Sequence, residues 1–243
     1  MKNYRTQTID EKIHAAGFTP LDVLLVGATG VGKSSTLNAL FGEGIAAVGE
    51  GVDPETMEVE HYKINEVLRI WDSPGLGDGV AEDKRHEITI KDSLCKNYTY
   101  DDAEWGFIDL VIVILDGSSR DMGTTYHLLE QVILHNIAPE RVIIAINKAD
   151  MAMSGRSWDK SANKPQEKLL EFLESKAISV ANRLSESTYL EIKKPVYYSA
   201  EKEYNLDRLM DSIIDHIPTQ KRIPDQNFYE HCLIQLKRAG FEL

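Results

Sequence analysis

Apolar residues along the chain change their spacing repeatedly, and the changes predict alternating strands and helices. Predominantly apolar runs are typical of strands buried in a sheet, and such runs occupy residues 21–26 (LDVLLV), 107–117 (FIDLVIVILDG), 141–147 (RVIIAIN) and 194–200 (KPVYYSA). Apolar residues at helical spacing predict helices over residues 34–41, 124–136, 164–184 and 206–217. Pro218 ends the last of these helices.

One pair of neighbouring segments has a different pattern. Residues 57–64 (MEVEHYKI) and 67–72 (VLRIWD) alternate apolar and polar side chains on either side of Asn65 and Glu66, which predicts two antiparallel strands joined by a tight turn. Strand and helix alternate along the rest of the chain. We therefore expect an α/β fold, a mostly parallel sheet with helices on both faces.

The two ends of the chain add short helical segments to this pattern. Residues 8–18 place Ile9 and Ile13 at helical spacing, and residues 227–240 (NFYEHCLIQLKRAG) predict a terminal helix ended by Gly240. We expect three parts, namely an N-terminal helical extension at 1–19, the main domain at 20–218 and a C-terminal helical extension at 219–243.

Composition limits the classes of protein that this chain can represent. A formal net charge of -12 makes it a poor candidate for non-specific binding to nucleic acid or to anionic membrane, because its overall field repels phosphate. Cys95 and Cys232 lie far apart without metal-site or disulfide-framework spacing. No apolar run approaches the roughly 18 residues of a membrane span, and residues 1–12 lack a signal-peptide core. We expect a soluble, cytoplasmic protein.

A glycine-rich stretch between the first strand and its helix carries the clearest chemistry. It fits the pattern G-x-x-x-x-G-K-S/T, in which backbone N–H groups surround a polyphosphate, the lysine neutralises the β- and γ-phosphates, and the serine hydroxyl binds Mg²⁺. A glycine-rich turn without a ligand is the alternative, and the loop alone does not separate ATP from GTP. The matching residues are Gly27, Ala28, Thr29, Gly30, Val31, Gly32, Lys33 and Ser34.

Two further motifs follow at strand ends and indicate the nucleotide. Asp72 and Gly75 form D-x-x-G, where the carboxylate can hold the Mg²⁺ shell and the glycine N–H can meet a γ-phosphate. Asn147, Lys148 and Asp150 form N-K-x-D, in which the last carboxylate can accept both N1–H and N2–H of guanine. Adenine would leave that carboxylate unpaired, which favours guanine. Either tetrapeptide also occurs as a plain turn or a helix cap.

Two weaker candidates complete the set. Ser199 and Ala200 end the last predicted strand, where a backbone N–H could meet guanine O6. Thr56 lies at the far end of a glycine-rich segment and is our candidate for the second protein ligand of Mg²⁺, ordered when a γ-phosphate is present. It can equally be a strand-start residue. The metal ligands expected from the sequence are thus Ser34, Thr56 and Asp72.

Taken in order, GATGVGKSS, Thr56, DSPG, NKAD and SA resemble the signature of a small G domain over most of the chain. The sequences of two segments, DSPGLGDG and GEGVDPET, resemble those of the Era-like branch of translation-factor-related GTPases, in particular the predicted GTPases of bacterial genomes and cryptic prophages. The resemblance implies a Ras-like fold with a six-stranded sheet and one antiparallel edge strand. It also implies binding of Mg²⁺ and of GTP or GDP, with Ser35 among the residues that bind the nucleotide. It further implies slow hydrolysis of GTP that involves Lys33, Thr56 and Gly75.

Departures from this signature affect the expected reaction. Leu76 follows D-x-x-G where many GTPases carry a glutamine that orients water, so help must come from elsewhere. Gly30 stands where potassium-activated relatives carry asparagine, which makes potassium activation doubtful. Arg120 could reach the phosphates of a partner chain, but a solvated loop arginine or a pair with Asp121 is the simpler interpretation. His86 is expected to be an exposed helix residue. Residues 219–243 are too few for the RNA-binding domain of Era.

Three functions remain open at this point. The first is a GTP-hydrolysing switch that acts through mobile segments at 42–57 and 75–105 and recruits a protein effector or an activating partner. The second is a G domain that forms a homodimer across its nucleotide face and hydrolyses weakly. The third is a nucleotide kinase, which the N-K-x-D motif and the lack of an arginine-rich lid disfavour. Nothing indicates a DNA-binding domain.

Overall fold

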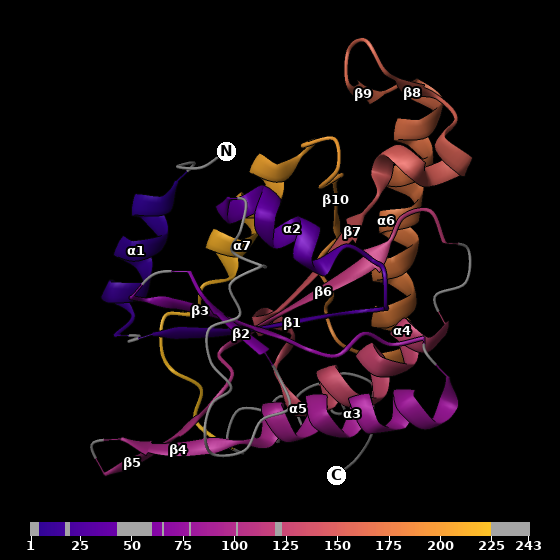
Figure 1. The fold of residues 1–243 in the computed structure, drawn as a ribbon. Coiled ribbons are helices and arrows are strands. Elements are labelled where there is room, and N and C mark those ends of the chain that lie inside the picture. Colours follow the sequence, from indigo (N-terminus) through magenta and orange to yellow (C-terminus); the bar gives the residue numbers. More distant parts are fainter. Residues whose placement is uncertain are drawn as a thin grey trace.

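The computed structural model describes residues 5–17, 20–42, 60–64, 66–77, 79–100, 102–119 and 123–224 (Figure 1). Its main sheet has six strands in the order β10-β7-β6-β1-β3-β2. β2 pairs antiparallel with β3, and every other pair is parallel. The expected α/β fold with one antiparallel edge strand is confirmed. The strands are β1 (Leu21–Gly27), β2 (Glu60–Lys63), β3 (Leu68–Asp72), β6 (Leu110–Asp116), β7 (Val142–Asn147) and β10 (Val196–Tyr197).

Helices cover both faces of this sheet, as strands with two buried faces require. Along β1, Leu24 and Val26 face the core formed with α3 and α6, while Val23 and Leu25 face the core formed with α1, α2 and α7. Figure 1 shows the second group on the opposite side of the strands from α3 and α5. The helices are α1 (Thr6–Ala15), α2 (Lys33–Phe41), α3 (Val80–Cys95), α4 (Gly123–Leu128), α5 (Leu134–Asn136), α6 (Glu167–Thr188) and α7 (Leu206–His216).

Irregular helical turns and two small hairpins complete the fold. A π-helical turn, η2 (Leu129–Ile133), joins α4 to α5 within the single helix expected at 124–136, and the 3-10 segments are η3 (Pro139–Arg141) and η4 (Ala149–Gly155). The hairpins, which the sequence pattern did not predict, are β4 (Asn97–Tyr100) with β5 (Ala103–Gly106) and β8 (Trp158–Asp159) with β9 (Lys164–Pro165).

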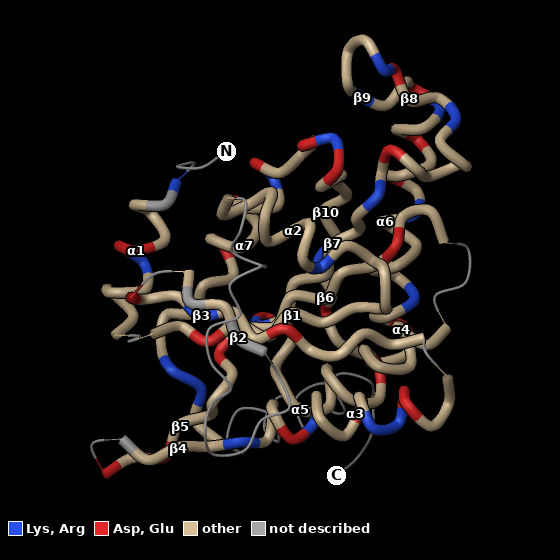
Figure 2. Tube along the Cα trace, viewed as in Figure 1, with Lys and Arg blue, Asp and Glu red and all other residues tan. Residues whose placement is uncertain are grey.

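Residues 75–105, one of the two segments through which the sequence suggested that a switch would act, contain α3 and most of the β4–β5 hairpin. Acidic and basic residues alternate along α3 and along α6 in Figure 2. None of the helices in the described part of the chain has the length and apolar character needed to cross a membrane.

Buried charged groups gather at the edge of the sheet where the parallel strands begin. Asp22 accepts two hydrogen bonds from Arg69, at 2.8 and 2.9 Å, and one from the Trp71 indole at 2.8 Å. Such bidentate pairs are stronger than neutral hydrogen bonds. Asp109 is fully buried beside Lys221, whose Nζ lies 3.4 Å from Asp109 Oδ2.

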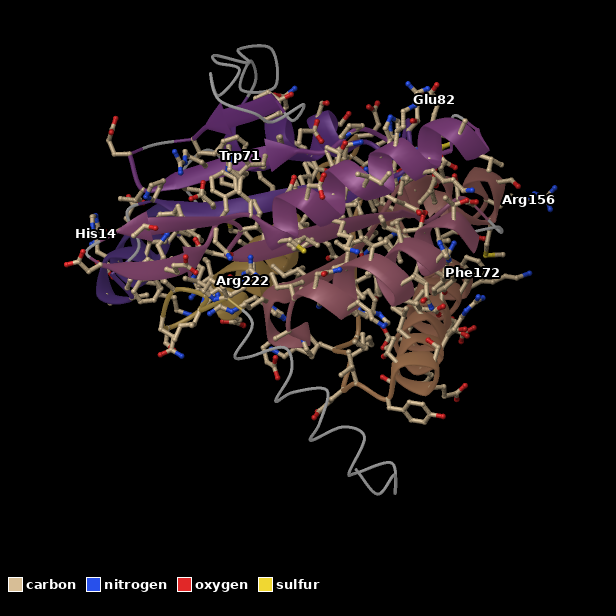
Figure 3. All side chains as sticks on the ribbon, turned by 90° about the horizontal axis from the view of Figure 1, so that it is seen from below. His14, Trp71, Glu82, Arg156, Phe172 and Arg222 are labelled. Carbon is tan, nitrogen blue, oxygen red and sulfur yellow. The ribbon has the colours of Figure 1, made fainter. Side chains whose placement is uncertain are left out.

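Residues 219–224 run back over this edge and contain no helix. Arg222, labelled with Trp71 in Figure 3, donates to the carbonyls of Ile108 and Leu94, at 3.0 and 2.5 Å. The Gly106 N–H donates to Arg222 O at 2.7 Å. These bonds fix the chain after α7 to the start of β6. The expected terminal helix at 227–240 lies outside the described residues.

Replacement of Asp109 by asparagine tests this buried cluster. Burial raises the pKa of Asp109 from 3.8 to about 6, although Lys221 and Arg141 favour the charged form and Asp22 opposes it. The unfolded chain therefore loses this proton at lower pH than the folded chain. The contribution of Asp109 to the free energy of unfolding thus falls as pH rises from 3.8 towards 6 and changes little above that.

The Asp109→Asn variant lacks this titration. We expect its free energy of unfolding, relative to the wild type, to rise across that window by up to about 3 kcal/mol, at about 1.4 kcal/mol per pKa unit. Urea denaturation of both proteins between pH 4 and pH 7 measures the difference. A constant difference over this range would contradict the assignment.

Candidate nucleotide-binding site

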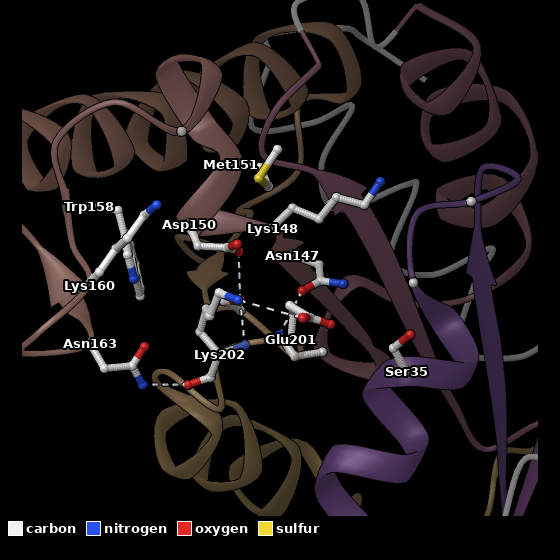
Figure 4. A pocket seen from close by; sticks show the side chains of 15 residues that line it. Ser35, Asn147, Lys148, Asp150, Met151, Trp158, Lys160, Asn163, Glu201 and Lys202 are labelled. Carbon is white, nitrogen blue, oxygen red and sulfur yellow. Dashed lines mark hydrogen bonds and ion pairs between the residues drawn. The ribbon is translucent and has the colours of Figure 1, made fainter.

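A cavity of about 840 Å³ opens at the edge of the sheet where the parallel strands end (Figure 4). It is lined by residues from the loop after β1, from the segment after β7, from the β8–β9 hairpin and from the loop after β10. Ligands of open α/β sheets bind at this edge. Three of the motifs identified in the sequence therefore meet at one cavity.

The glycine-rich loop after β1 has the backbone that its composition predicts. Gly30 and Gly32 have φ values of 72° and 95°, which L side chains rarely adopt. A Cβ on Gly32 would lie 2.5 Å from the side-chain nitrogen of Asn147. The loop therefore needs glycine there both for its backbone angles and for close contact with β7.

Lys33 begins α2, whose N-terminus faces the loop. Lys33 Nζ lies 3.4 Å from Gly27 O and 4.0 Å from Asp72 Oδ1, so the lysine stands between the glycine-rich loop and the D-x-x-G motif. Ser34 and Ser35 are exposed in the first turn of α2. A helix N-terminus with a lysine and exposed hydroxyls is suited to an anion.

The D-x-x-G loop is hydrogen-bonded directly to the glycine-rich loop. Thr29 N–H donates to Leu76 O at 2.7 Å, and a Cβ on Gly75 would lie 2.4 Å from Thr29 Oγ1. The Leu76 side chain is 1% exposed and belongs to the core between β1, α3 and β6. Leu76 therefore serves packing, and its side chain is directed away from solvent.

Asn147 joins the two loops on either side of it. Its Nδ2 donates to Val31 O at 2.9 Å, and its Oδ1 accepts the Ala200 N–H at 3.0 Å. The side chain is buried, and both of its polar atoms are bonded. In this structure the Ala200 N–H, which the sequence suggested as a donor to guanine O6, is donated to Asn147.

A hydrogen bond from Ser199 fixes the orientation of the Asp150 carboxylate at the cavity. The serine Oγ donates to Asp150 Oδ1 at 2.6 Å and accepts the Lys202 N–H at 3.1 Å. Asp150 is buried but lines the cavity. A buried carboxylate with a fixed orientation and remaining lone pairs can recognise a donor pair on a bound base.

Lys148 of the same motif is bound to a residue that sequence reasoning missed. Its Nζ donates to Asp116 Oδ2 at 2.7 Å. Although burial opposes ionisation, hydrogen bonds from Lys148 and from Ser118 keep the pKa of Asp116 below its ordinary value. Asp116 is the last residue of the buried strand β6 at the same sheet edge, which is the signal that could have identified it.

Lys176 from α6 fixes the loop that carries Asp116. Its Nζ donates to the carbonyl oxygens of Asp116, Gly117 and Ser119, at 3.3, 2.9 and 2.7 Å. Burial lowers the pKa of Lys176. Gly117 N–H also donates to Asn147 O at 2.7 Å, so this loop connects α6 with the N-K-x-D motif.

Some expected residues remain apart from this arrangement. Thr56 and Arg120 lie outside the described residues. His86 on α3 is half-buried, contrary to the expected exposure, and its Nδ1 has no hydrogen-bond partner in the described part of the chain. Within that part, no group of three or more His, Cys, Asp or Glu side chains is arranged to hold a metal ion.

The parallel sheet, the glycine-rich loop and the buried Asn147–Asp150 pair together define a P-loop nucleotide-binding domain of the G-domain type. The family model described as "50S ribosome-binding GTPase" matches residues 22–148, just over half of the sequence, and the chain belongs to that GTPase family. A second model, "Elongation factor Tu GTP binding domain", matches residues 103–219. Membership supports binding of GTP or GDP at this site.

Curated relatives resemble this chain over part of their length. The tRNA modification GTPase MnmE of Sulfurovum sp. is 31% identical over 133 residues, which are 54% of this chain and 27% of that protein. GTPase Der of Agrobacterium fabrum is 24% identical over 206 residues, 84% of this chain and 37% of that protein. The probable GTP-binding protein EngB of Thermotoga petrophila is 28% identical over 131 residues, which are 54% of this chain and 64% of that protein. The chain thus spans less than two thirds of each of these relatives.

Solved structures with the same fold include two G-domain proteins. Toc33 from Arabidopsis thaliana, in complex with GDP and Mg²⁺, superposes with a TM-score of 0.59 at 15% identity, covering 93% of this chain and 97% of that one. The bacterial dynamin GTPase LeoA from ETEC superposes with a TM-score of 0.54 at 17% identity, covering 98% of this chain and 41% of that one. At these identities the likeness establishes the fold alone.

Replacement of Lys176 by methionine tests its role in holding the loop at Asp116. The variant removes the ammonium donor from three carbonyl groups, and we expect the free energy of unfolding to fall by about 1–3 kcal/mol. Lys168→Met on the exposed face of α6 is the control and should leave stability unchanged. Equal urea midpoints for the two variants would show that the loop does not depend on Lys176.

Proposed function

We propose that this chain binds GTP and GDP with Mg²⁺ in the cavity, hydrolyses GTP slowly to GDP and phosphate, and acts as a switch. The observation that carries the proposal is the buried Asp150 carboxylate at the cavity, oriented by Ser199 and joined through the N-K-x-D motif to the phosphate loop. In this proposal residues 20–218 form the G domain, with extensions at 1–19 and 219–243.

Guanine recognition follows from the chemistry of Asp150. One of its oxygens already accepts from Ser199, and the remaining lone pairs can accept from N1–H and N2–H of guanine. Adenine offers an acceptor at N1 and no amino group at C2, so it would leave the buried carboxylate unpaired. That loss disfavours adenine nucleotides strongly.

We assign phosphate and metal binding to the glycine-rich loop, whose Gly30 and Gly32 line the cavity, and to the residues beside it. Ser34 and Asp72 offer the hard oxygen atoms that Mg²⁺ prefers, and Mg²⁺ commonly takes only one or two protein ligands beside phosphate oxygens. The donor chemistry therefore fits this ion, with Thr56 as a third proposed ligand. Bound Mg²⁺ would neutralise charge on the β- and γ-phosphates. Lys33 would exchange its long bond to Gly27 O for a phosphate oxygen.

At the position after D-x-x-G, where many GTPases carry a water-orienting glutamine, this chain has Leu76. Leu76 is directed into the core, so it offers no group to an attacking water. We therefore propose slow intrinsic hydrolysis and assistance from a protein partner, with movement of residues 42–57 and 75–105 reporting the bound state. A homodimer across the nucleotide face is the second candidate, and a cytoplasmic location accompanies both.

The Asp150→Asn variant tests guanine recognition. An amide at this position can donate to the C2 carbonyl of xanthine but no longer accepts from both guanine donors. We expect the affinity for GDP to fall by at least about 100-fold, roughly 2.8 kcal/mol, with a gain for xanthosine diphosphate. Calorimetry on nucleotide-free protein measures both. Asp215→Asn, the same change at an exposed position of α7 that does not line the cavity, is the control and should keep wild-type GDP affinity. Unchanged GDP affinity in Asp150→Asn would refute the assignment.

Turnover at several protein concentrations separates the two modes of hydrolysis. A switch that depends on another protein should hydrolyse GTP slowly, with a specific activity that does not vary with concentration. Assembly across the nucleotide face should raise the specific activity with concentration, and Arg120→Ala should abolish the rise. Phosphate release from GTP and from ATP is measured in parallel. Hydrolysis of ATP as fast as GTP would contradict the proposed function itself.

A further inference from the structure

The β8–β9 hairpin is built into the wall of the nucleotide cavity. Trp158 and Asn163 from the hairpin line the same cavity as Asp150 and Ser199 (Figure 4). The base of the hairpin is closed by a hydrogen bond from Gln166 N–H to Ser157 O at 2.8 Å. The hairpin therefore lies beside the end of the cavity at which the base-recognising carboxylate stands.

Several non-glycine residues in and before the hairpin have positive φ values. Met153, Ser154, Ser157 and Asn163 all have φ between 48° and 63°, a region that costs non-glycine residues free energy. Such conformations persist where surrounding contacts determine them. Trp158 and Met153 are both packed against the main core. The segment is thus held in one arrangement and is not a loose surface loop.

Two contacts tie the hairpin to the loop after β10. Asn163 Nδ2 donates to Lys202 O at 2.7 Å, and the Trp158 and Tyr204 rings meet edge to face, with centroids 5.4 Å apart and planes at 89°. Ser199 and Tyr204 exchange backbone hydrogen bonds of 3.1 and 3.0 Å, which close the six-residue loop on itself. The hairpin and the loop form one connected unit.

The same loop orients the groups proposed to recognise guanine. Ser199 bonds Asp150, Ala200 bonds Asn147, and Lys202 N–H bonds the Ser199 hydroxyl. The hairpin contacts Lys202 and Tyr204 in this loop, and residues 199–202 of the same loop line the cavity. Displacement of the hairpin would therefore loosen the loop that fixes Asp150.

We propose that the β8–β9 hairpin is a clamp that slows release of the guanine nucleotide, with Asn163 as a positioning residue that acts through Lys202 and Ser199. This inference rests on the proposed function, since it assigns a role in GDP release to the same site. Opening of the clamp, and not only breakage of the base contacts, limits nucleotide dissociation.

The Asn163→Asp variant removes the hydrogen bond from Asn163 to Lys202 O. Aspartate has the same shape and tolerates positive φ, but its carboxylate cannot donate to Lys202 O. We expect dissociation of a fluorescent GDP analogue, chased with excess GDP, to become about 5- to 10-fold faster, with little change in the association rate. Asn136→Asp is the matched control, because Asn136 also donates its amide to a carbonyl, Val132 O, but does not line this cavity.

The outcomes distinguish the clamp from the site it serves. Faster dissociation in Asn163→Asp alone, with urea midpoints equal to those of Asn136→Asp, supports the clamp. Unchanged dissociation in Asn163→Asp, while wild-type protein binds GDP by calorimetry, overturns the clamp and leaves the proposed function intact. Absence of GDP binding by the wild type overturns the proposed function first.

Discussion

The bridge made by the Asn147 side chain is the interaction on which the site depends. It bonds Val31 in the phosphate loop and Ala200 in the loop after β10, so two separate connections are fixed at one buried amide. The approach is possible only because Gly32 and Gly117 lack side chains, since a Cβ on either would lie within 2.6 Å of Asn147 atoms. The ends proposed to hold phosphate and base are therefore set relative to each other by β7, a strand buried throughout.

The two edges of the sheet use buried charge differently. At the edge where parallel strands begin, the Asp22 and Asp109 carboxylates are bonded by Arg69 and Lys221, and their role is to fix chain segments. At the nucleotide edge, Asp150 keeps lone pairs for a ligand. Removing one partner of a buried pair is costly, because the other charge is left buried without compensation. In the proposed function, a bound base would use the acceptor capacity that Asp150 has beyond its bond with Ser199.

Much of this architecture could be predicted because strand burial leaves a direct trace in the sequence. The apolar runs at β1, β6 and β7 are buried strands, and the glycine-rich loop and the N-K-x-D motif lie at the ends of β1 and β7. The β8–β9 hairpin could not be predicted, because its strands are two residues long and are held by contacts such as Asn163 to Lys202. The bonds of Lys176 likewise depend on a helix far along the chain. Leu76 was recognised as unable to assist water, but its burial is a tertiary property.

Leu76 connects the D-x-x-G loop to the glycine-rich loop. Its side chain anchors the D-x-x-G loop in the core, and its carbonyl accepts the Thr29 N–H, an amide of the phosphate loop. In the proposed switch, a γ-phosphate recruits Gly75 N–H, and Gly75 already contacts Thr29 so closely that a methyl group would not fit. A shift of Gly75 would therefore disturb the Thr29–Leu76 bond and, through the buried leucine, the core cluster that also contains Ile90 of α3. A change at the phosphate thus has a short physical route to the helix that follows the D-x-x-G loop.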